Sequence, residues 1–148
     1  MARTAPESGP VVQLTRTLPA PRERVFRAWT DPAEIQGWLV PEGTRMLEAR
    51  ADVRVGGDFR FSYRAADGQA VYIVGTYVEV EPPERLAFTW LFEGIDFAET
   101  LVTVELRQAG DGTELKLTHE RLATRGWGEF HLAGWTSVLD RLPLYLSS

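Results

Sequence analysis

The side chains of this sequence that are best suited to chemistry are two histidines and a group of tyrosines and tryptophans. His119 and His131 are the two histidines. Either imidazole could hydrogen-bond a ligand or act as a general base. Neither has a carboxylate at a fixed spacing to orient its ring, so we expect hydrogen-bonded histidines at the ends of elements. Without an obvious third ligand they predict no metal site.

Other catalytic groups are missing or are better explained as structure. Cysteine is absent, which excludes disulfides, thiol nucleophiles and thiolate metal sites. Glu93, Asp96 and Glu99 surround a glycine in an expected hairpin loop, where solvated charges are a simpler interpretation than an acid–base pair. We therefore predict no catalytic residue and no cofactor.

Aromatic residues are more numerous than one small core needs, at 11% of the chain. Tyrosine and tryptophan add a polar atom that can orient a ligand. Each residue taken alone is more simply explained by core packing, but together they predict a lined pocket. With the histidines, the candidate ligand-binding residues are Trp38, Phe59, Phe61, Tyr63, Tyr72, Trp90, His119, Trp127, His131 and Trp135.

Length and composition indicate one domain of 148 residues, which we place at residues 11–148 after a flexible tail at 1–10. The apolar fraction of 44% is enough for a core. The net charge of -5 and scattered basic residues argue against a nucleic-acid partner. No apolar run approaches the roughly 20 residues of a membrane span, and the first residues lack a secretory apolar region. We expect a cytoplasmic protein.

The first part of the chain predicts a strand followed by two short helices. Residues 11–18 alternate as a strand does. Pro21 to Trp29 has helical spacing, with proline at a tolerated first position. Asp31 can cap a second helix that extends to Leu39.

Later segments predict a run of strands and one long helix. From residue 44 to residue 120 the apolar period is two, and glycine-containing turns divide the run into about six antiparallel strands. The period becomes helical from Thr124 onward. Pro143 predicts a kink or the end of this helix near Leu142. Gly134 predicts either a close approach to the sheet or an opening beside it.

The layout is of the α+β class: an antiparallel sheet of about seven strands with one apolar side, covered by the long C-terminal helix. A twisted sheet bends away from a straight helix, so the gap between them is where we expect a ligand. The two short helices meet at a proline and lack long cooperative packing. We predict that they form a gate with the loop from Pro41 to Gly43, and that Trp38 lies near its mouth.

Four segments carry a family resemblance: APRERVFRAWTDP at 20–32, DVRVGG followed by FRF at 52–61, PPERL followed by FTW at 82–90, and GW followed by LDRL at 134–142. The chain resembles the bacterial family of activator of heat shock protein 90 ATPase homologues, in the START-like or SRPBCC superfamily. The resemblance implies a helix-grip fold with a hydrophobic pocket between sheet and helix. Pro143 departs from the family pattern, which usually continues with helix formers.

Members of this superfamily bind lipids, polyketides or other apolar molecules, so the resemblance and the aromatic set together favour a noncatalytic protein that binds a hydrophobic small molecule. Two alternatives stay open. One is a cyclase-type or hydrolase-type enzyme that uses a histidine together with Tyr63 or Tyr72 in the same cavity. The other is a stress-response protein that contacts a chaperone, as the family name suggests. A homodimer is also left open.

Overall fold

The computed structural model describes residues 9–40, 43–96 and 98–147. Most of the predicted tail, and Pro41 and Glu42 of the predicted gate loop, lie outside the described residues. The elements in chain order are β1 (Val12–Leu18), α1 (Arg22–Thr30), α2 (Pro32–Ile35), β2 (Met46–Ala51), β3 (Asp58–Arg64), β4 (Ala70–Glu81), β5 (Arg85–Phe92), β6 (Thr100–Ala109), β7 (Gly112–Glu120) and α3 (Arg125–Leu146).

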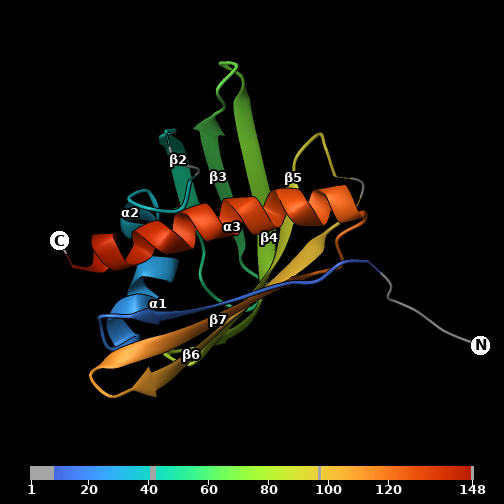
Figure 1. Cartoon of the computed structure of the whole chain (residues 1–148). Coiled ribbons are helices and arrows are strands. Elements are labelled where there is room, and N and C mark those ends of the chain that lie inside the picture. Colours follow the sequence, from blue (N-terminus) through green and yellow to red (C-terminus); the bar gives the residue numbers. More distant parts are fainter. Residues whose placement is uncertain (1–8, 41–42, 97, 148) are drawn as a thin grey trace, which may run out of the picture.

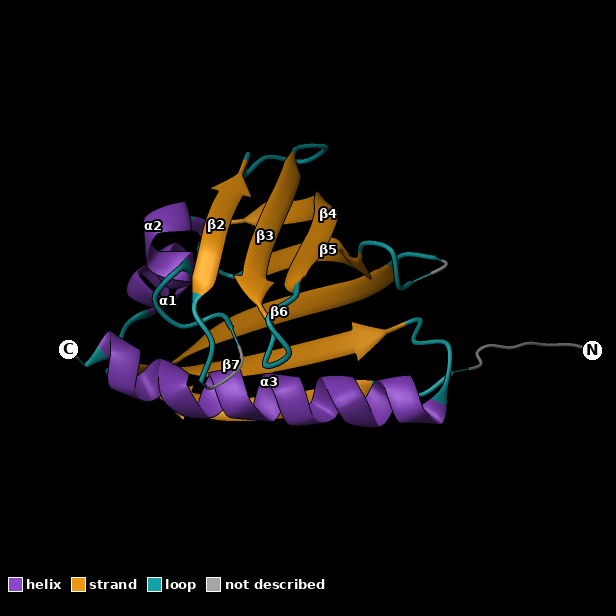
Figure 2. Ribbon diagram, turned by 90° about the horizontal axis from the view of Figure 1, so that it is seen from above, coloured by secondary structure: helices purple, strands orange, loops and turns teal. Residues whose placement is uncertain are grey.

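The seven strands form one antiparallel sheet in the order β1-β7-β6-β5-β4-β3-β2. Strands β2 to β7 follow one another as neighbours, which short turns allow. Strand β1 pairs with β7, so α1 and α2 carry the chain from one edge of the sheet to the other (Figure 1). The sheet curves around α3, and the predicted helix-grip arrangement is confirmed (Figure 2).

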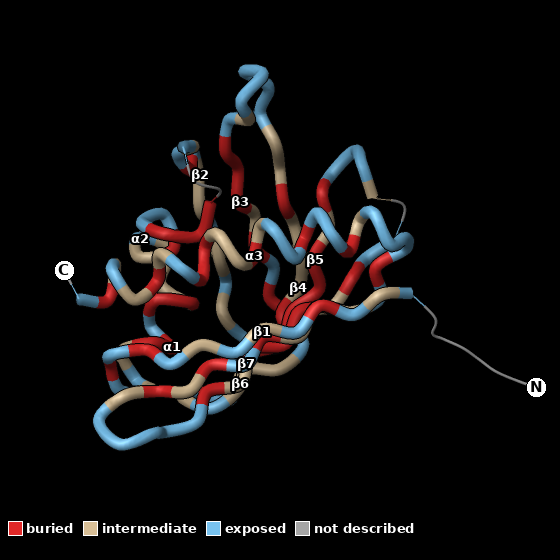
Figure 3. The backbone as a smooth tube through the Cα atoms, in the orientation of Figure 1, coloured by how far each residue is buried: buried red, intermediate tan, exposed pale blue. Residues whose placement is uncertain are grey.

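The alternation of each strand sends its apolar residues to the side facing α3. The predicted inner faces of β3, β5 and β7 are all buried, as the tube in Figure 3 shows for the centre of the sheet. Register brings these faces together: Phe61 pairs with Ile73 across β3 and β4, and Val102 pairs with His119 across β6 and β7. The core therefore lies between the concave side of the sheet and the helices.

Helix α3 begins where the sequence predicts. The hydroxyl of Thr124 accepts a hydrogen bond from the backbone N–H of Trp127 at 3.0 Å. Of the two predicted outcomes at Pro143, the end of the helix near Leu142 is wrong, because the helix continues through Pro143 to Leu146, while the kink stays a prediction. Proline removes only one backbone donor there, and burial of Leu142 and Leu146 in the core holds the last turn.

The second short helix is shorter than predicted. Asp31 caps α2, accepting from the N–H of Ala33 at 3.0 Å, but α2 ends at Ile35 rather than Leu39. The carbonyls of Trp38 and Val40 accept hydrogen bonds from the Arg141 guanidinium instead of from a further helical turn. The segment after α2 is thereby tied to α3.

Candidate functional site between the sheet and the long helix

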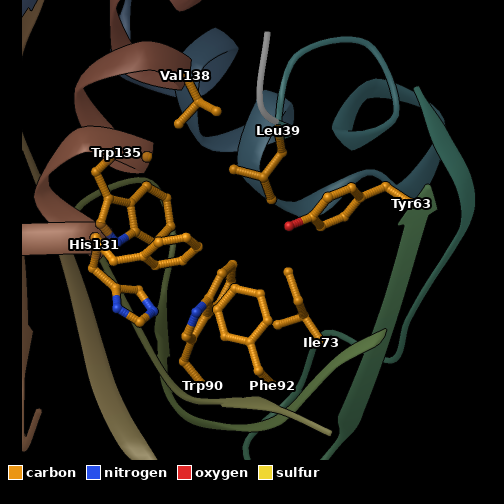
Figure 4. Close-up of a pocket in the computed structure, with 10 residues that line it drawn as sticks. Leu39, Tyr63, Ile73, Trp90, Phe92, His131, Trp135 and Val138 are labelled. Atoms are coloured by element: carbon orange, nitrogen blue, oxygen red, sulfur yellow. The ribbon is translucent and has the colours of Figure 1, made fainter. Parts of the chain in front are cut away.

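A cavity of about 70 Å³ lies between α3 and strands β3, β4 and β5 (Figure 4). Its walls come from the strands, from α3 and from the segment after α2. The described residues that line it are Leu39, Tyr63, Ile73, Trp90, Phe92, Phe130, His131, Gly134, Trp135 and Val138. None of them carries a formal charge at neutral pH when histidine is neutral.

Gly134 is the place where α3 leaves room for this cavity. A Cβ atom built on Gly134 would meet no atom within 4 Å, so the glycine is not required by close approach to the sheet. The same residue lines the cavity. Of the two predicted explanations for this glycine, the structure supports an opening beside the helix.

His119, although it faces inward as predicted, belongs to a closed hydrogen-bond chain rather than to the lining. Its Nδ1 accepts from Nε1–H of Trp135 at 3.0 Å, and its Nε2 lies 2.7 Å from Oγ1 of Thr100. The Thr100 hydroxyl donates to the carbonyl of Trp90, so Nε2 of His119 must be the donor to Thr100. Burial, with a smaller effect of His131, lowers the pKa of His119 to about 2.

In contrast, only one of the two ring nitrogens of His131 forms a hydrogen bond within the described residues. Nδ1–H donates to the backbone carbonyl of Trp127 at 2.9 Å, while Nε2 is buried and has no hydrogen-bond partner within the described chain. Since Nδ1 carries the proton, Nε2 of the neutral ring is an acceptor. Burial lowers the pKa of His131, against the opposing effect of the Trp127 carbonyl. The ring therefore stays neutral near pH 7 with a free lone pair.

Two further residues that line the cavity carry a polar side-chain atom. The indole Nε1 of Trp90 is buried and has no partner within the described segments. Figure 4 shows the hydroxyl of Tyr63 directed from β3 into the cavity, across from α3. Burial raises the pKa of Tyr63, so this hydroxyl remains protonated and can donate a hydrogen bond. The lining residues are thus mainly apolar, and Tyr63, Trp90 and His131 carry polar atoms that lie outside the hydrogen-bond chain of His119.

Several of the predicted site residues lie elsewhere. Phe59 and Phe61 stack on one another with ring centroids 4.7 Å apart in the packed core beside the cavity. Trp127 covers the outer side of the His131 ring, 4.7 Å between centroids. Tyr72 neighbours Ile73 on β4 and so lies on the opposite face of the sheet, under the Arg60 guanidinium at 4.6 Å. The structure gathers Tyr63, Trp90, His131 and Trp135 around the cavity.

Trp38 was expected at the mouth of the gate, and that expectation is wrong. Its side chain is only 1% exposed, and its Nε1–H donates to the Ala28 carbonyl at 3.0 Å. It packs edge-on against Trp29, with centroids 4.7 Å apart, so its neighbour Leu39 faces the cavity instead. Earlier opening of the short helices stays a prediction, which hydrogen exchange at residues 33–43 against residues 86–92 would test.

Five apolar residues that line the cavity are not among the predicted candidates: Leu39, Ile73, Phe92, Phe130 and Val138. Ile73 could have been found from register, because it pairs with Phe61 on the neighbouring strand. Phe130 precedes His131 on α3 and is half exposed at the cavity wall. No sequence signal distinguishes Leu39 from the other apolar residues near α2.

The sequence profile of the "Activator of Hsp90 ATPase homolog 1-like protein" family matches residues 19–147. The chain therefore belongs to that family, as its motifs suggested. None of the curated proteins matches the chain. Among the described residues, no helix is long and apolar enough to cross a membrane.

Solved structures agree with this assignment. A protein of Chromobacterium violaceum is 30% identical with a TM-score of 0.83, covering 93% of this chain and 97% of that one. The AHSA1 protein of Silicibacter pomeroyi is 26% identical with a TM-score of 0.82, covering 93% and 98%. CalU16 of Micromonospora echinospora is 30% identical with a TM-score of 0.71, covering 93% and 76%.

Proposed function

We propose that this protein binds a hydrophobic small molecule, of the aromatic or acyl kind, in the cavity beneath α3 and does not transform it. The observation that carries the proposal is an uncharged, mainly apolar cavity where Gly134 leaves open space beside the helix. A cavity of this kind, with few polar groups, is typical of ligand sites.

The size of the cavity limits how a ligand can enter. At about 70 Å³ it is smaller than the roughly 150 Å³ apolar cavity that accepts benzene in an engineered protein. A ring-sized ligand therefore requires part of the wall to move. The segment carrying Leu39 is the part best placed to do so, because it lines the cavity and follows a helix of only four residues. Its movement would have to break the hydrogen bonds from Arg141 to the carbonyls of Trp38 and Val40.

Hydrogen bonding in the cavity favours binding over acid–base catalysis. The partner of His131 Nδ1–H is a backbone carbonyl, not a carboxylate, and burial makes the ring a weaker base. An enzyme remains the second candidate because Tyr63 and His131 line one cavity. Mass spectrometry of a bound compound after incubation separates the two: we expect it unchanged, and a product would favour the enzyme.

Tryptophan fluorescence tests the proposal directly, since Trp90 and Trp135 line the cavity. Toluene and naphthalene should change the emission saturably. A Gly134→Leu variant should weaken binding by about tenfold or more, because the new side chain takes up the space in which the ring is buried. The control is Gly126→Leu on the same helix, which also has open space but does not line this cavity.

The proposal fails if neither probe perturbs the wild-type emission. It also fails if the Gly134→Leu variant, folded as judged by its unfolding midpoint, binds the probes as the wild type does. The chaperone contact suggested by the family name is a separate candidate. A pull-down with the cognate chaperone that shows retention, or a change in its ATPase rate, would favour it.

A further inference from the structure

Two residues that line the cavity each have a polar side-chain atom that is buried without a hydrogen-bond partner within the described part of the chain. These atoms are Nε2 of His131 and Nε1 of Trp90, on residues that are 4% and 5% exposed. Leaving a buried donor or acceptor unpaired costs about 1–3 kcal/mol. A ligand atom placed beside either atom would supply the missing hydrogen bond, and both residues line the cavity.

The two atoms have opposite hydrogen-bonding characters. The Nδ1–H of His131 donates to the Trp127 carbonyl, which leaves Nε2 as an acceptor. The indole nitrogen of Trp90 can only donate. Figure 4 shows the indole nitrogen on the side of the Trp90 ring that faces His131, and no hydrogen bond joins the two side chains. A group that fits between them must accept one hydrogen bond and donate another.

The charge of the cavity decides what kind of group this is. No cation among the described lining residues could neutralise a carboxylate, whose oxygens would also face the lone pair of His131. An ammonium group would meet the N–H of Trp90 and would find no counter-ion among the described residues that line the cavity. A neutral hydroxyl both donates and accepts, and it loses little on leaving water when both bonds form.

The rings around the two atoms favour an aromatic body for the ligand. Trp90 lies 5.1 Å from Trp135 between ring centroids, and Phe92 lies 5.5 Å from His131. Rings at such distances offer offset and edge-on positions for a further aromatic ring. The hydroxyl of Tyr63, on the opposite wall, is available for a second polar contact.

We propose that the cavity selects a hydroxylated aromatic compound whose neutral hydroxyl donates to Nε2 of His131 and accepts from Nε1 of Trp90. This inference rests on the proposed function, since it specifies the ligand class of the same cavity. In this proposal His131 and Trp90 recognise the hydroxyl of the ligand, whereas the hydrogen-bond chain of His119 stabilises the fold.

Matched ligands of one shape test the assignment by calorimetry: p-cresol, toluene and 4-methylbenzoate. We expect p-cresol to bind about tenfold more tightly than toluene, the usual worth of one or two hydrogen bonds. 4-Methylbenzoate should bind more weakly than either. In Trp90→Phe and in His131→Phe, the preference of p-cresol over toluene should fall towards one while toluene still binds.

Trp127→Phe is the matched control. Its Nε1 is also buried without a partner within the described residues, but Trp127 does not line the cavity, so the preference should persist. Equal binding of p-cresol and toluene by the wild type would overturn the hydroxyl assignment and leave hydrophobic binding intact. Tightest binding of 4-methylbenzoate would overturn it as well. Failure of both neutral ligands to bind would instead remove the proposed function itself.

Discussion

His119 and His131 lie with their ring centroids only 4.5 Å apart and are both buried, yet the fold uses them differently. His119 on β7 has a partner for each nitrogen, in a chain that runs from Trp135 through Thr100 to the Trp90 carbonyl. Among the residues that the structure describes, His131 on α3 has a partner for one nitrogen only. Burial alone therefore does not distinguish the two histidines, whereas the pairing of their ring nitrogens does.

The difference follows the shape of the sheet. Figure 2 shows β7 extending along α3, while β3 and β4 rise away from it. Where strand and helix lie close, side chains reach one another and close their hydrogen bonds. Where the twisted sheet departs from the helix, the aromatic residues leave a cavity and polar atoms lack partners. Trp90 belongs to both regions, because its carbonyl ends the His119 chain while its indole lines the cavity.

The largest expected effect comes from breaking the closed chain. His119→Leu removes the acceptor of the Trp135 N–H in the core and should cost about 2–3 kcal/mol of unfolding free energy. His131→Leu removes the single hydrogen bond to the Trp127 carbonyl and an acceptor without a partner among the described residues, and it should cost about 1 kcal/mol. Urea unfolding of both variants measures the difference. Equal losses would contradict the distinction between the two rings.

A matched pair of tryptophan variants sharpens the comparison. Trp135→Phe and Trp90→Phe delete the same atoms, and both residues are 4–5% exposed. Only Trp135→Phe also breaks a hydrogen bond, which leaves Nδ1 of His119 unpaired. We expect it to lose about 1–2 kcal/mol more than Trp90→Phe. Thermal or urea unfolding can resolve such a difference, and the reverse order would be evidence against the account.

Stability should also depend on pH. Histidine in the unfolded chain has a pKa of about 6.5 and takes up a proton below that pH. Folded His119 does so only near its pKa of about 2, and burial lowers the pKa of His131 too. Each such histidine makes the unfolding free energy fall by up to about 1.4 kcal/mol per pH unit below pH 6.5. His131→Phe should therefore lower the wild-type slope between pH 6 and pH 5.

Urea titrations at several pH values in that window give the slope before most carboxylates titrate. An unchanged slope in His131→Phe would mean that this ring takes up its proton as readily in the folded protein as in the unfolded chain. That result would conflict with its burial beside Trp127 and Phe92.

The smallest effect concerns the open space on α3. Gly134→Ala should stabilise the protein by up to about 1 kcal/mol, the helix preference of alanine over glycine, because the new methyl meets no atom. The variant should nevertheless bind toluene more weakly, since the methyl occupies cavity space. Gly126→Ala near the start of α3 serves as the control that leaves binding unchanged. A Gly134→Ala variant that is less stable than the wild type would show that the space is needed for packing.

Much of the fold was predictable because the spacing of apolar residues along the sequence indicates the strands and the long helix. The inner faces of β3, β5 and β7 follow from a period of two, and the buried stripe of α3 from a helical period. Predictions from local sequence failed where contacts between distant residues determine the structure. Arg141 binds backbone carbonyls of the segment after α2, which does not continue as a helix. Core packing lets α3 continue beyond Pro143.

The candidate site was predictable in composition but not in detail. Tyr63, Trp90, His131 and Trp135 were recognised as inward-facing aromatic or imidazole side chains. Their hydrogen bonds could not be predicted, because partners such as Thr100 and Trp135 come from elements far apart in sequence. Tyr72 was expected to line the pocket, but it lies on the outer face of the sheet, because its neighbour Ile73 on the same strand occupies the inner face.

The most direct test of the different roles of the two histidines is a long-range ¹H–¹⁵N NMR spectrum of their side chains during titration with p-cresol. The account predicts that the Nε2 resonance of His131 moves as its lone pair accepts the phenol hydrogen bond, while both nitrogens of His119 keep their positions. Movement of His119 with His131 unaffected would contradict it, as would saturating p-cresol with neither ring perturbed.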